Sequence, residues 1–244
     1  FWLIDTINVM KPDVLHLVLM QKSLIPFYLW LFGKRKIAIV QTIANSGFSL
    51  GGKLPVVEKY LGYLLFSRSN ILDSLYPNFL RTSFGSRYAN KVRTSPGSFV
   101  DSELFKPEEQ KEKIITFAGR LIPEKNPYLV IDAIKIISER NPNLLRGWKI
   151  RMLGSGPLKQ TLLRKIGQYH LDRLISIEEV YSTHTVLNKS LIFLSMQSTD
   201  NYPSQSLLEA MASGNAIIAS DVGHTRLLVN KDMGLLVNLS ADSL

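Results

Sequence analysis

Short apolar runs separated by polar turns dominate the pattern of hydrophobic and polar positions in the first hundred residues. Four of these runs lie at residues 14–20, 36–41, 70–76 and 91–95. Runs of this length bounded by turn residues are typical of buried strands in a parallel sheet. We therefore predict four strands, with a helix after the first and a second helix at residues 56–66, where apolar positions have helical spacing. The segment 45–53, which holds three glycines and two serines, is predicted to be a loop.

The alternation restarts with clearer periodicity in the second part of the chain. The predicted strands lie at residues 114–118, 149–153, 191–195 and 216–219, and the predicted helices lie at residues 128–140, 158–169 and 205–213. Strands that alternate with helices indicate parallel sheets with right-handed crossovers, so each part is predicted to have a Rossmann-like, doubly wound α/β fold. Residues 106–113 are charged and contain no large apolar side chain. The predicted domains are therefore 1–107 and 108–244.

The positive charge of the chain is concentrated in its first part. The formal net charge is +9, and residues 1–100 hold twelve Lys or Arg against four Asp or Glu. A basic surface can bind nucleic acid, anionic lipid or phosphorylated substrates, or can be an ordinary solvated surface. The apolar stretch 15–32 is interrupted by polar residues and a proline, so it is predicted to be a strand followed by a helix instead of a membrane span.

Composition excludes or disfavours several kinds of site. The chain has no cysteine, which excludes disulfides, thiolate zinc sites and cysteine nucleophiles. Its four histidines, His16, His170, His184 and His224, lack the spacing of metal ligands, so no metal site is expected. The chain begins with Phe1 and has no basic segment before its first apolar residues, which argues against a secretory signal and leads us to expect an earlier natural start.

Two loops that follow predicted strands of the second part carry candidate chemistry, because ligands of open parallel sheets bind beyond the carboxyl ends of the strands. In the first, Gly119 allows a ligand to approach the backbone, while Arg120 and Lys125 supply two cations suited to phosphate. An exposed loop with two solvated cations is the simpler alternative. The Gly-Ser-Gly turn at 154–156 resembles half of a dinucleotide-binding fingerprint, and tight packing of strand against helix explains it equally well.

The most specific segment is 199–214, which reads Thr-Asp-Asn-Tyr-Pro-Ser-Gln-Ser-Leu-Leu-Glu-Ala-Met-Ala-Ser-Gly. Ser204 is predicted to cap a helix that Gly214 ends, and the free N–H groups at a helix start attract phosphate. Glu209 lies in the second turn and Asp200 just before the helix, so one carboxylate can reach ribose hydroxyls and the other a sugar beyond the phosphates. An ordinary capped amphipathic helix is the alternative interpretation.

In this order, the motifs resemble those of the family-four glycosyltransferases, a large retaining GT-B family. The resemblance covers residues 113–237 through Phe-Ala-Gly-Arg-Leu with its downstream lysine, Gly-x-Gly-Pro, and Leu-Leu-Glu-Ala-Met-Ala-x-Gly followed by Ile-Ile-Ala-Ser-Asp-Val-Gly. It is looser over residues 1–112, through Lys-Pro-Asp-Val-Leu-His and the segment 98–107. The resemblance implies two Rossmann-like domains facing a cleft, the first binding the acceptor and the second the nucleotide sugar, both incomplete in a chain truncated at both ends.

The resemblance also implies roles for single residues. Arg120 and Lys125, with the helix start at Ser204, Gln205 and Ser206, would bind the donor diphosphate, and Gly119, Gly154, Gly156 and Val180 would line the nucleotide site. Glu209 matches the glutamate that holds the ribose, and Asp200 lies near the acidic position that faces the donor sugar, so both are predicted as catalytic residues. Two positions depart from the family, because Asn201 stands where it has its first glutamate and His224 follows Gly223 where it has a second glycine. Asp200 is predicted to replace the first glutamate, with Asn201 as the alternative.

The function implied is transfer of a sugar, with retention, from a UDP- or GDP-linked donor to a glycan or lipid-linked acceptor in the synthesis of cell-surface polysaccharide. No cofactor other than the donor and no metal is expected. The expected location is the cytoplasm, with contact to the anionic inner face of the membrane. An NAD(P)-dependent oxidoreductase is the main alternative, against which the incomplete Gly-x-Gly-x-x-Gly argues. A nucleic-acid-binding protein is less favoured, because the aromatic residues lie in apolar runs and not among the basic residues.

Overall fold

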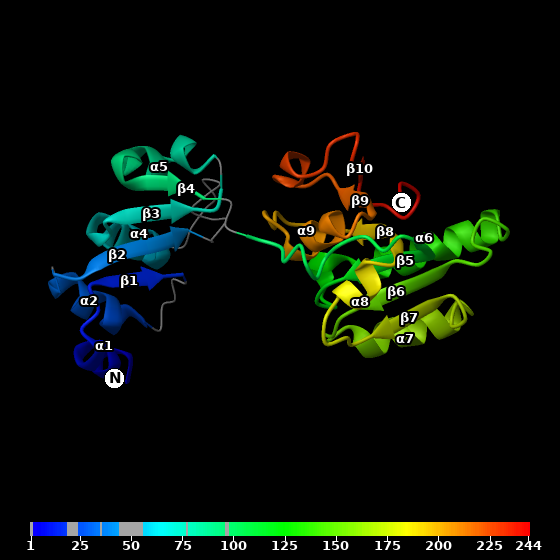
Figure 1. The fold of residues 1–244 in the computed structure, drawn as a ribbon, viewed down its shortest axis with the longest axis horizontal. Helices are drawn as coiled ribbons and strands as arrows, with labels where there is room; N and C mark the ends of the chain where they lie inside the picture. Colours follow the sequence, from blue (N-terminus) through cyan, green and yellow to red (C-terminus); the bar gives the residue numbers. More distant parts are fainter. Residues whose placement is uncertain (1, 19–23, 35, 44–55, 77, 96–97) are drawn as a thin grey trace. The chain divides into compact units, whose positions relative to one another are not determined.

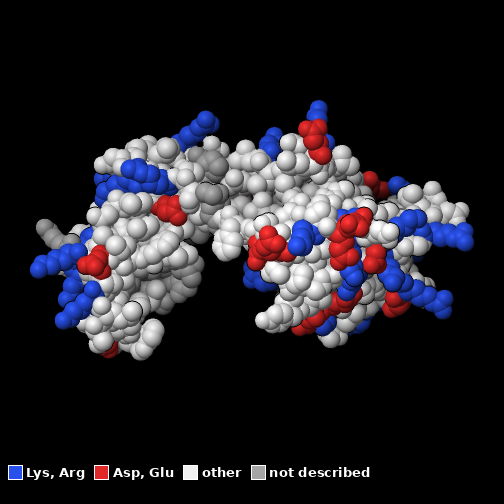
Figure 2. All heavy atoms as spheres, viewed as in Figure 1, with Lys and Arg blue, Asp and Glu red and all other residues white. Residues whose placement is uncertain are grey.

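The computed structural model describes residues 2–18, 24–34, 36–43, 56–76, 78–95 and 98–244. The chain forms two compact units, unit 1 from Phe1 to Gly97 and unit 2 from Ser98 to Leu244. Both are α/β units built on a parallel sheet (Figure 1). On the face shown in Figure 2, Lys and Arg atoms predominate on unit 1, whereas basic and acidic atoms lie interspersed on unit 2.

Unit 1 contains a four-stranded parallel sheet in the order β1-β2-β3-β4. Its elements are α1 (Trp2–Met10), β1 (Val14–Leu17), α2 (Ile25–Gly33), β2 (Ala38–Ile43), α4 (Val56–Arg68), β3 (Ile71–Ser74), α5 (Ser83–Arg87) and β4 (Val92–Thr94). The four predicted strands and two predicted helices are confirmed, while α1 and α5 were not predicted. The predicted loop at 45–53 lies outside the described residues, within the gap 44–55.

Strand β2 is buried at most of its positions, as its apolar run predicts. Ile39, Gln41 and Ile43 lie on one face and are almost fully buried. Burial of β1 was predicted wrongly, since Val14 is 55% exposed and its strand shows no buried residue. The physical reason is that β1 stands at the end of the described sheet and pairs there with β2.

Unit 2 contains a six-stranded parallel sheet in the order β10-β9-β8-β5-β6-β7. Its elements are β5 (Glu112–Ala118), α6 (Pro127–Arg140), β6 (Lys149–Leu153), α7 (Lys159–Gln168), β7 (Ile175–Glu178), α8 (His184–Leu187), β8 (Ser190–Ser195), α9 (Gln205–Ala212), β9 (Ala216–Ser220) and β10 (Gly234–Val237). The predicted strands and helices of this part are confirmed. The chain leaves β5 toward β7 and then returns to place β8 on the other side of β5, so the switch point of the sheet lies between β5 and β8.

Helices cover both faces of the unit 2 sheet, as the predicted doubly wound fold requires. On one face α6 and α7 pack Ile131 and Leu162 against Ile150 of β6 in the larger core cluster. On the other face α9 packs Leu207 against Phe193 of β8. All five side chains are at most 1% exposed, so the two cores fix the positions of the loops that leave the strands.

The boundary between the units lies ten residues before the predicted one, since residues 98–107 belong to unit 2. Phe105 is buried in the core beneath α9. The Asn188 amide donates to the carbonyl of Leu104 at 2.8 Å and accepts from the Lys106 N–H at 3.2 Å and from the Ser213 hydroxyl at 2.9 Å. A buried phenyl ring and these hydrogen bonds hold the segment on unit 2, which charge and proline content did not indicate.

Candidate functional site

The loops after β5, β6, β8 and β9 all leave the carboxyl edge of the unit 2 sheet, next to its switch point. Direct contacts hold them together there. The side chain of Asn126 donates to the carbonyl of Met196 at 2.9 Å, and the N–H of Ser198 donates to the carbonyl of Glu124 at 2.9 Å. The loop after β5 is therefore fixed against the loop after β8.

The glycines of the turn after β6 allow backbone to pack on backbone. A Cβ atom at Gly154, whose φ is +148°, would lie 2.0 Å from the carbonyl oxygen of Gly119, and one at Gly156 would lie 2.6 Å from that of Leu121. The N–H of Leu121 donates to the carbonyl of Ser155 at 2.9 Å. These contacts agree with the tight-packing interpretation of this turn, which brings the first two candidate loops into contact.

The two predicted cations lie close enough to influence each other. Lys125 donates from Nζ to Oε1 of Gln197 at 2.7 Å. Burial lowers the pKa of the Lys125 ammonium, and the charge of Arg120 lowers it further. The guanidinium of Arg120 is exposed. An anion bound between the two would remove this repulsion and replace the lost solvation of Lys125.

A pocket of about 340 Å³ opens beside Arg120. Its lining combines predicted and unpredicted residues, which are Gly119, Arg120, Leu153, Gly154, Ser155, Glu179, Val180 and Thr183. Gly156 is not part of the lining, because it packs against Leu121. Glu179 and Thr183 were missed because they follow β7, a four-residue strand with no continuous apolar run.

The start of α9 differs from its predicted capping geometry. Ser204 occupies the N-cap position with extended backbone angles, but its side chain makes no capping hydrogen bond. The residue is 3% exposed, and within the described part of the chain Oγ has no hydrogen-bond partner. A buried hydroxyl without a partner costs about 1–3 kcal/mol, so this atom is suited to a ligand that the helix start attracts. The side chain of Gln205 instead donates to the carbonyl of Phe99 at 3.0 Å.

Glu209 is linked to the pocket beside Arg120 through the side chain of Thr183. Its Oε2 accepts a hydrogen bond from the Thr183 hydroxyl at 3.0 Å, and its Oε1 accepts one from the Gln205 amide at 3.2 Å. Thr183 also lines the pocket, so the carboxylate is oriented toward the loop that follows β7. Sequence reasoning selected Glu209 but not Thr183, the polar residue before the short helix α8.

Asp200 forms a buried pair with His224. Its Oδ2 lies 2.7 Å from Nδ1 of the imidazole, and its Oδ1 accepts from the backbone N–H of His224 at 3.2 Å. Their side chains are 7% and 10% exposed, and the Tyr202 ring lies beside the imidazole at 5.7 Å. Gly223 has φ +56°, and a Cβ there would lie 2.4 Å from Cγ of Asp200. Both carboxylate oxygens of Asp200 thus engage His224, while Asn201 is exposed.

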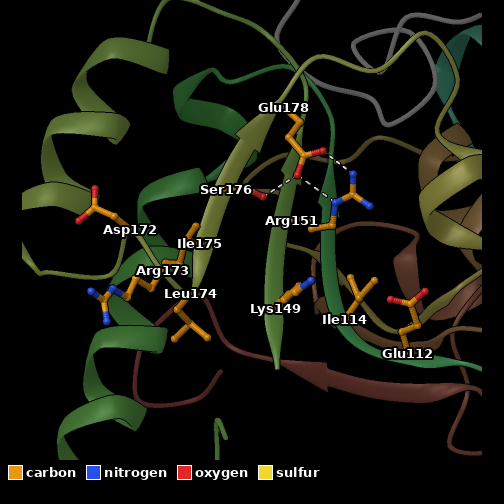
Figure 3. A pocket seen from close by; sticks show the side chains of 10 residues that line it. All are labelled: Glu112, Ile114, Lys149, Arg151, Asp172, Arg173, Leu174, Ile175, Ser176 and Glu178. Carbon is orange, nitrogen blue, oxygen red and sulfur yellow. Dashed lines mark hydrogen bonds and ion pairs between the residues drawn. The ribbon is translucent and has the colours of Figure 1, made fainter. Parts of the chain in front are cut away.

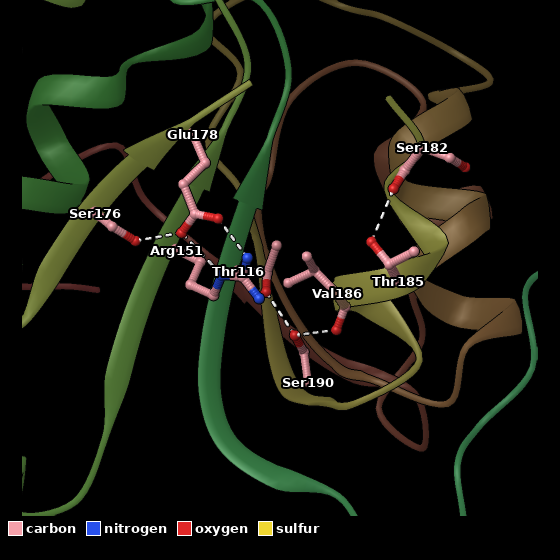
Figure 4. Close-up of polar contacts among 8 residues, drawn as sticks. All are labelled: Thr116, Arg151, Ser176, Glu178, Ser182, Thr185, Val186 and Ser190. Carbon is pink, nitrogen blue, oxygen red and sulfur yellow. Dashed lines mark hydrogen bonds and ion pairs between the residues drawn. The ribbon is translucent and has the colours of Figure 1, made fainter. Parts of the chain in front are cut away.

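A second pocket, of about 360 Å³, lies on the face of β5, β6 and β7 (Figure 3). Figure 3 shows Arg151 and Glu178 turned toward each other, with Nε donating to Oε1 at 2.9 Å. Figure 4 shows that Ser176 also donates to this carboxylate, at 2.5 Å, and that a separate hydroxyl pair, Thr116 and Ser190, bridges β5 and β8 at 2.6 Å. The charges of Arg151 and Glu178 neutralise each other, so we assign this pocket a structural role.

The pair of Arg151 and Glu178 predicts a pH-dependent stability. Hydrogen bonds from Arg151 lower the pKa of Glu178 from 4.5, against a smaller opposite effect of burial. The stabilisation is therefore present above pH 4.5 and is lost as pH falls through the lower folded pKa. Glu178→Gln should reduce the free energy of unfolding at neutral pH and have a smaller effect in acid, as measured by urea denaturation. Glu109→Gln, an exposed control, should leave the free energy of unfolding unchanged at both pH values. If Glu178→Gln reduced that free energy equally at neutral and at acidic pH, the prediction would be wrong.

Comparison with known proteins identifies the family. The family model of the glycosyl transferases group 1 matches residues 101–243. The chain is 22% identical over 198 residues to poly(ribitol-phosphate) alpha-N-acetylglucosaminyltransferase of Staphylococcus aureus, which covers 77% of this chain and 37% of that protein. It is 29% identical over 102 residues to a GalNAc-alpha-(1->4)-GalNAc-alpha-(1->3)-diNAcBac-PP-undecaprenol alpha-1,4-N-acetyl-D-galactosaminyltransferase of Campylobacter jejuni, covering 40% of this chain and 28% of that protein.

A solved structure agrees on the fold. The pneumococcal O-GlcNAc transferase GtfA, in complex with UDP and GlcNAc, superposes with a TM-score of 0.79 at 15% identity, over 100% of this chain and 49% of that one. The chain thus spans well under half the length of the curated relatives and about half of this structure. The match of the family model over more than half of the sequence, together with the two parallel-sheet units, shows that this chain belongs to the glycosyl transferases group 1 and has a GT-B fold.

Proposed function

We propose that unit 2 binds a nucleoside-diphosphate sugar and that the protein transfers the sugar, with retention, to a glycan or lipid-linked acceptor held by unit 1. One observation carries the proposal. A partly desolvated Lys125 beside Arg120 shares the carboxyl edge of the sheet with the start of α9, where the buried Ser204 hydroxyl is without a partner among the described residues. Two cations and a helix start with an unpaired hydroxyl form a site suited to a diphosphate.

This arrangement also suits the chemistry of glycosyl transfer. The bond between the sugar and the diphosphate breaks through an oxocarbenium-like transition state, in which negative charge increases on the departing diphosphate. Fixed positive charge at that position stabilises the transition state more than the bound donor. Arg120, Lys125 and the N–H groups of Gln205 and Ser206 would supply this charge, with no residue acting as a covalent nucleophile.

The rest of the donor fits the neighbouring groups. The pocket of about 340 Å³ between the loops after β5, β6 and β7 has room for the nucleoside. Glu209, oriented by Thr183 next to that pocket, would accept hydrogen bonds from the ribose hydroxyls. A UDP- or GDP-linked sugar is therefore the proposed donor, and UDP is favoured because GtfA, which shares the fold, was crystallised with it.

The relatives support the proposed class of acceptor. By their names, the staphylococcal protein transfers N-acetylglucosamine to poly(ribitol-phosphate) and the Campylobacter protein acts on a glycan linked to PP-undecaprenol. The first name describes a polymer acceptor and the second a lipid-linked glycan. We therefore place the proposed reaction in the synthesis of cell-surface polysaccharide, in the cytoplasm at the inner face of the membrane.

Binding of UDP should be accompanied by uptake of a proton. Because the pKa of Lys125 is lowered in the free protein, a larger part of its ammonium loses its proton in alkaline solution than in an ordinary lysine, and a bound diphosphate would raise that pKa again. Calorimetry in buffers of different ionisation enthalpy should therefore give different heats in alkaline solution. The difference should disappear in Lys125→Met, which cannot take up a proton.

The same titration separates the alternative functions. Binding of UDP or GDP without binding of NAD(P) or RNA supports the proposal. Binding of NAD(P) alone would establish the oxidoreductase alternative, and binding of RNA alone would establish the nucleic-acid alternative. Binding of none of these ligands would refute the proposed donor site.

The basic surface of unit 1 supports contact with an anionic membrane. Helix α2 exposes Leu29 and Phe32, three residues apart and 58% and 43% exposed, and Lys34 lies 5.1 Å from the Trp30 ring at the end of the same helix. Apolar and aromatic side chains followed by cations suit the interface of an anionic bilayer. Each suitably placed cation contributes about 1 kcal/mol there. None of the helices in the described ranges is long and apolar enough to cross a membrane.

The protein should sediment with vesicles that contain phosphatidylglycerol, and less of it should do so as the salt concentration rises. Leu29→Ser with Phe32→Ser should reduce the bound fraction, since the variant loses apolar contact with the lipid. Leu144→Ser, which changes an exposed leucine of unit 2, is the matched control. Equal recovery of the protein with phosphatidylglycerol and phosphatidylcholine vesicles would contradict the proposed contact with an anionic membrane.

A further inference from the structure

Three polar side chains form a chain of hydrogen bonds across unit 1. Nε2 of His16 on β1 lies 2.7 Å from Oγ1 of Thr42 on β2, and that hydroxyl donates to Oδ2 of Asp73 on β3 at 3.4 Å. Thr42 is 7% exposed, Asp73 is half-buried and His16 is exposed. A buried hydroxyl thus links an exposed imidazole to a carboxylate two strands away.

The strand register explains why these residues meet. His16 pairs with Val40, and Thr42 pairs with Asp73, so all three polar side chains lie on the same face of the sheet. Each is the residue before the last of its strand. The opposite face carries the buried Ile39 and Ile43. The chain of hydrogen bonds therefore follows the carboxyl edge of the sheet, where open parallel sheets bind ligands.

The three groups together determine where the imidazole proton lies. An ionised carboxylate only accepts hydrogen bonds, so the Thr42 hydroxyl directs its proton toward Asp73. Its oxygen is then an acceptor, and Nε2 of His16 must be the donor at 2.7 Å. This tautomer leaves the lone pair on Nδ1 of His16, the exposed residue of the three in the chain of hydrogen bonds.

We propose that Nδ1 of His16 accepts a hydrogen bond from a hydroxyl of the acceptor sugar, so that His16, oriented by Thr42 and Asp73, forms part of the acceptor site. This inference rests on the proposed glycosyltransferase function and adds an acceptor-binding residue to it. The carboxylate of Asp73 repels phosphate and disfavours an anionic group at this position. A lone pair on an imidazole nitrogen favours an uncharged O–H donor, which a hexose supplies on every face.

The tautomer can be measured directly. In the full chain labelled with ¹⁵N, long-range correlation spectra should show His16 protonated on Nε2 and unprotonated on Nδ1. Thr42→Val keeps the shape of the side chain but removes the hydroxyl, and should convert His16 into a mixture of tautomers. Addition of methyl hexosides should shift the Nδ1 resonance of the wild type. A proton on Nδ1 in the free wild-type protein, or an unchanged Nδ1 resonance with every hexoside, would overturn the proposal.

Kinetics give a second, independent test. With a UDP-sugar as donor and methyl hexosides as acceptors, His16→Leu should raise the acceptor KM about fivefold to tenfold, the effect of one lost hydrogen bond. His16→Asn, whose carbonyl oxygen stands near the position of Nδ1, should recover part of this loss. His170→Asn changes an exposed histidine of unit 2 with φ +57° and is the matched control. An acceptor KM that is unchanged in His16→Leu would also refute the role.

UDP affinity, measured on the same samples, separates this inference from the function on which it rests. All His16 and Thr42 variants should bind UDP as the wild type does, because the proposed donor site lies in unit 2. If the wild type bound no UDP, the proposed function would fail, and the hexoside-dependent shift would still decide whether His16 binds hydroxyl groups.

Discussion

Replacing Arg120 and Lys125 together with methionine should weaken UDP binding by about a hundredfold or more. Hydrogen bonds to charged groups contribute about 1.5–3 kcal/mol each, and about 1.4 kcal/mol corresponds to a tenfold change in affinity. Arg120→Ala alone should cost about tenfold. Lys125 is expected to contribute at least as much, because burial has already removed part of the solvation that a free cation would keep and the charge of Arg120 repels the ammonium in the absence of an anion.

The expected loss is local, and a matched variant tests this. Lys135→Met with Arg164→Met removes the same charge from α6 and α7, where Lys135 pairs with Glu139. Long-range effects on this scale are screened at physiological salt, so the control should change UDP affinity by about twofold at most. Calorimetry should show both proteins folded, with the same heat of unfolding. If the control lost as much affinity as the double variant, the cations at 120 and 125 would be only part of a general positive field.

The fold could be predicted where apolar runs are continuous. Strands β5, β6 and β8 have buried side chains at several successive positions, and their sequences show it. Strand β7, with the sequence Ile-Ser-Ile-Glu, has one buried residue and was missed. Its edge position in the sheet leaves half of its side chains accessible, so the sequence carries little hydrophobic signal.

The candidate site could be predicted only as far as topology determines it. Gly119, Arg120 and Gly154 come together because the carboxyl ends of β5 and β6 meet at one edge. Val180 follows the missed strand β7 and was predicted only through the family resemblance. The partner of Asp200 could not be predicted, since His224 lies 24 residues later and on the loop after another strand. The sequence also gave no sign that the Ser204 hydroxyl would not cap its helix, because side-chain rotamers depend on packing.

Asp200→Asn should lower kcat about a hundredfold while changing UDP affinity little. UDP lacks the donor sugar, so a residue that acts on the sugar during transfer affects turnover and not UDP binding. In this structure both oxygens of Asp200 engage His224, so we expect the carboxylate to act as a positioning group through the imidazole. The loss of a preorganised polar contact at a reacting centre costs about a hundredfold to a thousandfold in kcat.

A double-variant cycle tests whether the two residues act as one unit. His224→Gln should lower kcat by a similar factor, and the Asp200→Asn/His224→Gln protein should lose little more than either single variant. Gly223→Ala should reproduce the loss, because its Cβ would lie 2.4 Å from Cγ of Asp200 and would separate the pair. Fully additive losses would show that Asp200 and His224 act independently.

Asn201 provides the remaining control, since the family resemblance predicts the first glutamate at its position. Its side chain is exposed, so Asn201→Ala should leave the fold and the pairing of Asp200 with His224 unchanged. A small effect on kcat in Asn201→Ala, beside a large one in Asp200→Asn, would assign the sugar-orienting role to the buried pair. The reverse result would move that role to Asn201. If Asp200→Asn instead weakened UDP binding and turnover together, the pair would only hold the loop after β8 against the loop after β9, and its role would be structural.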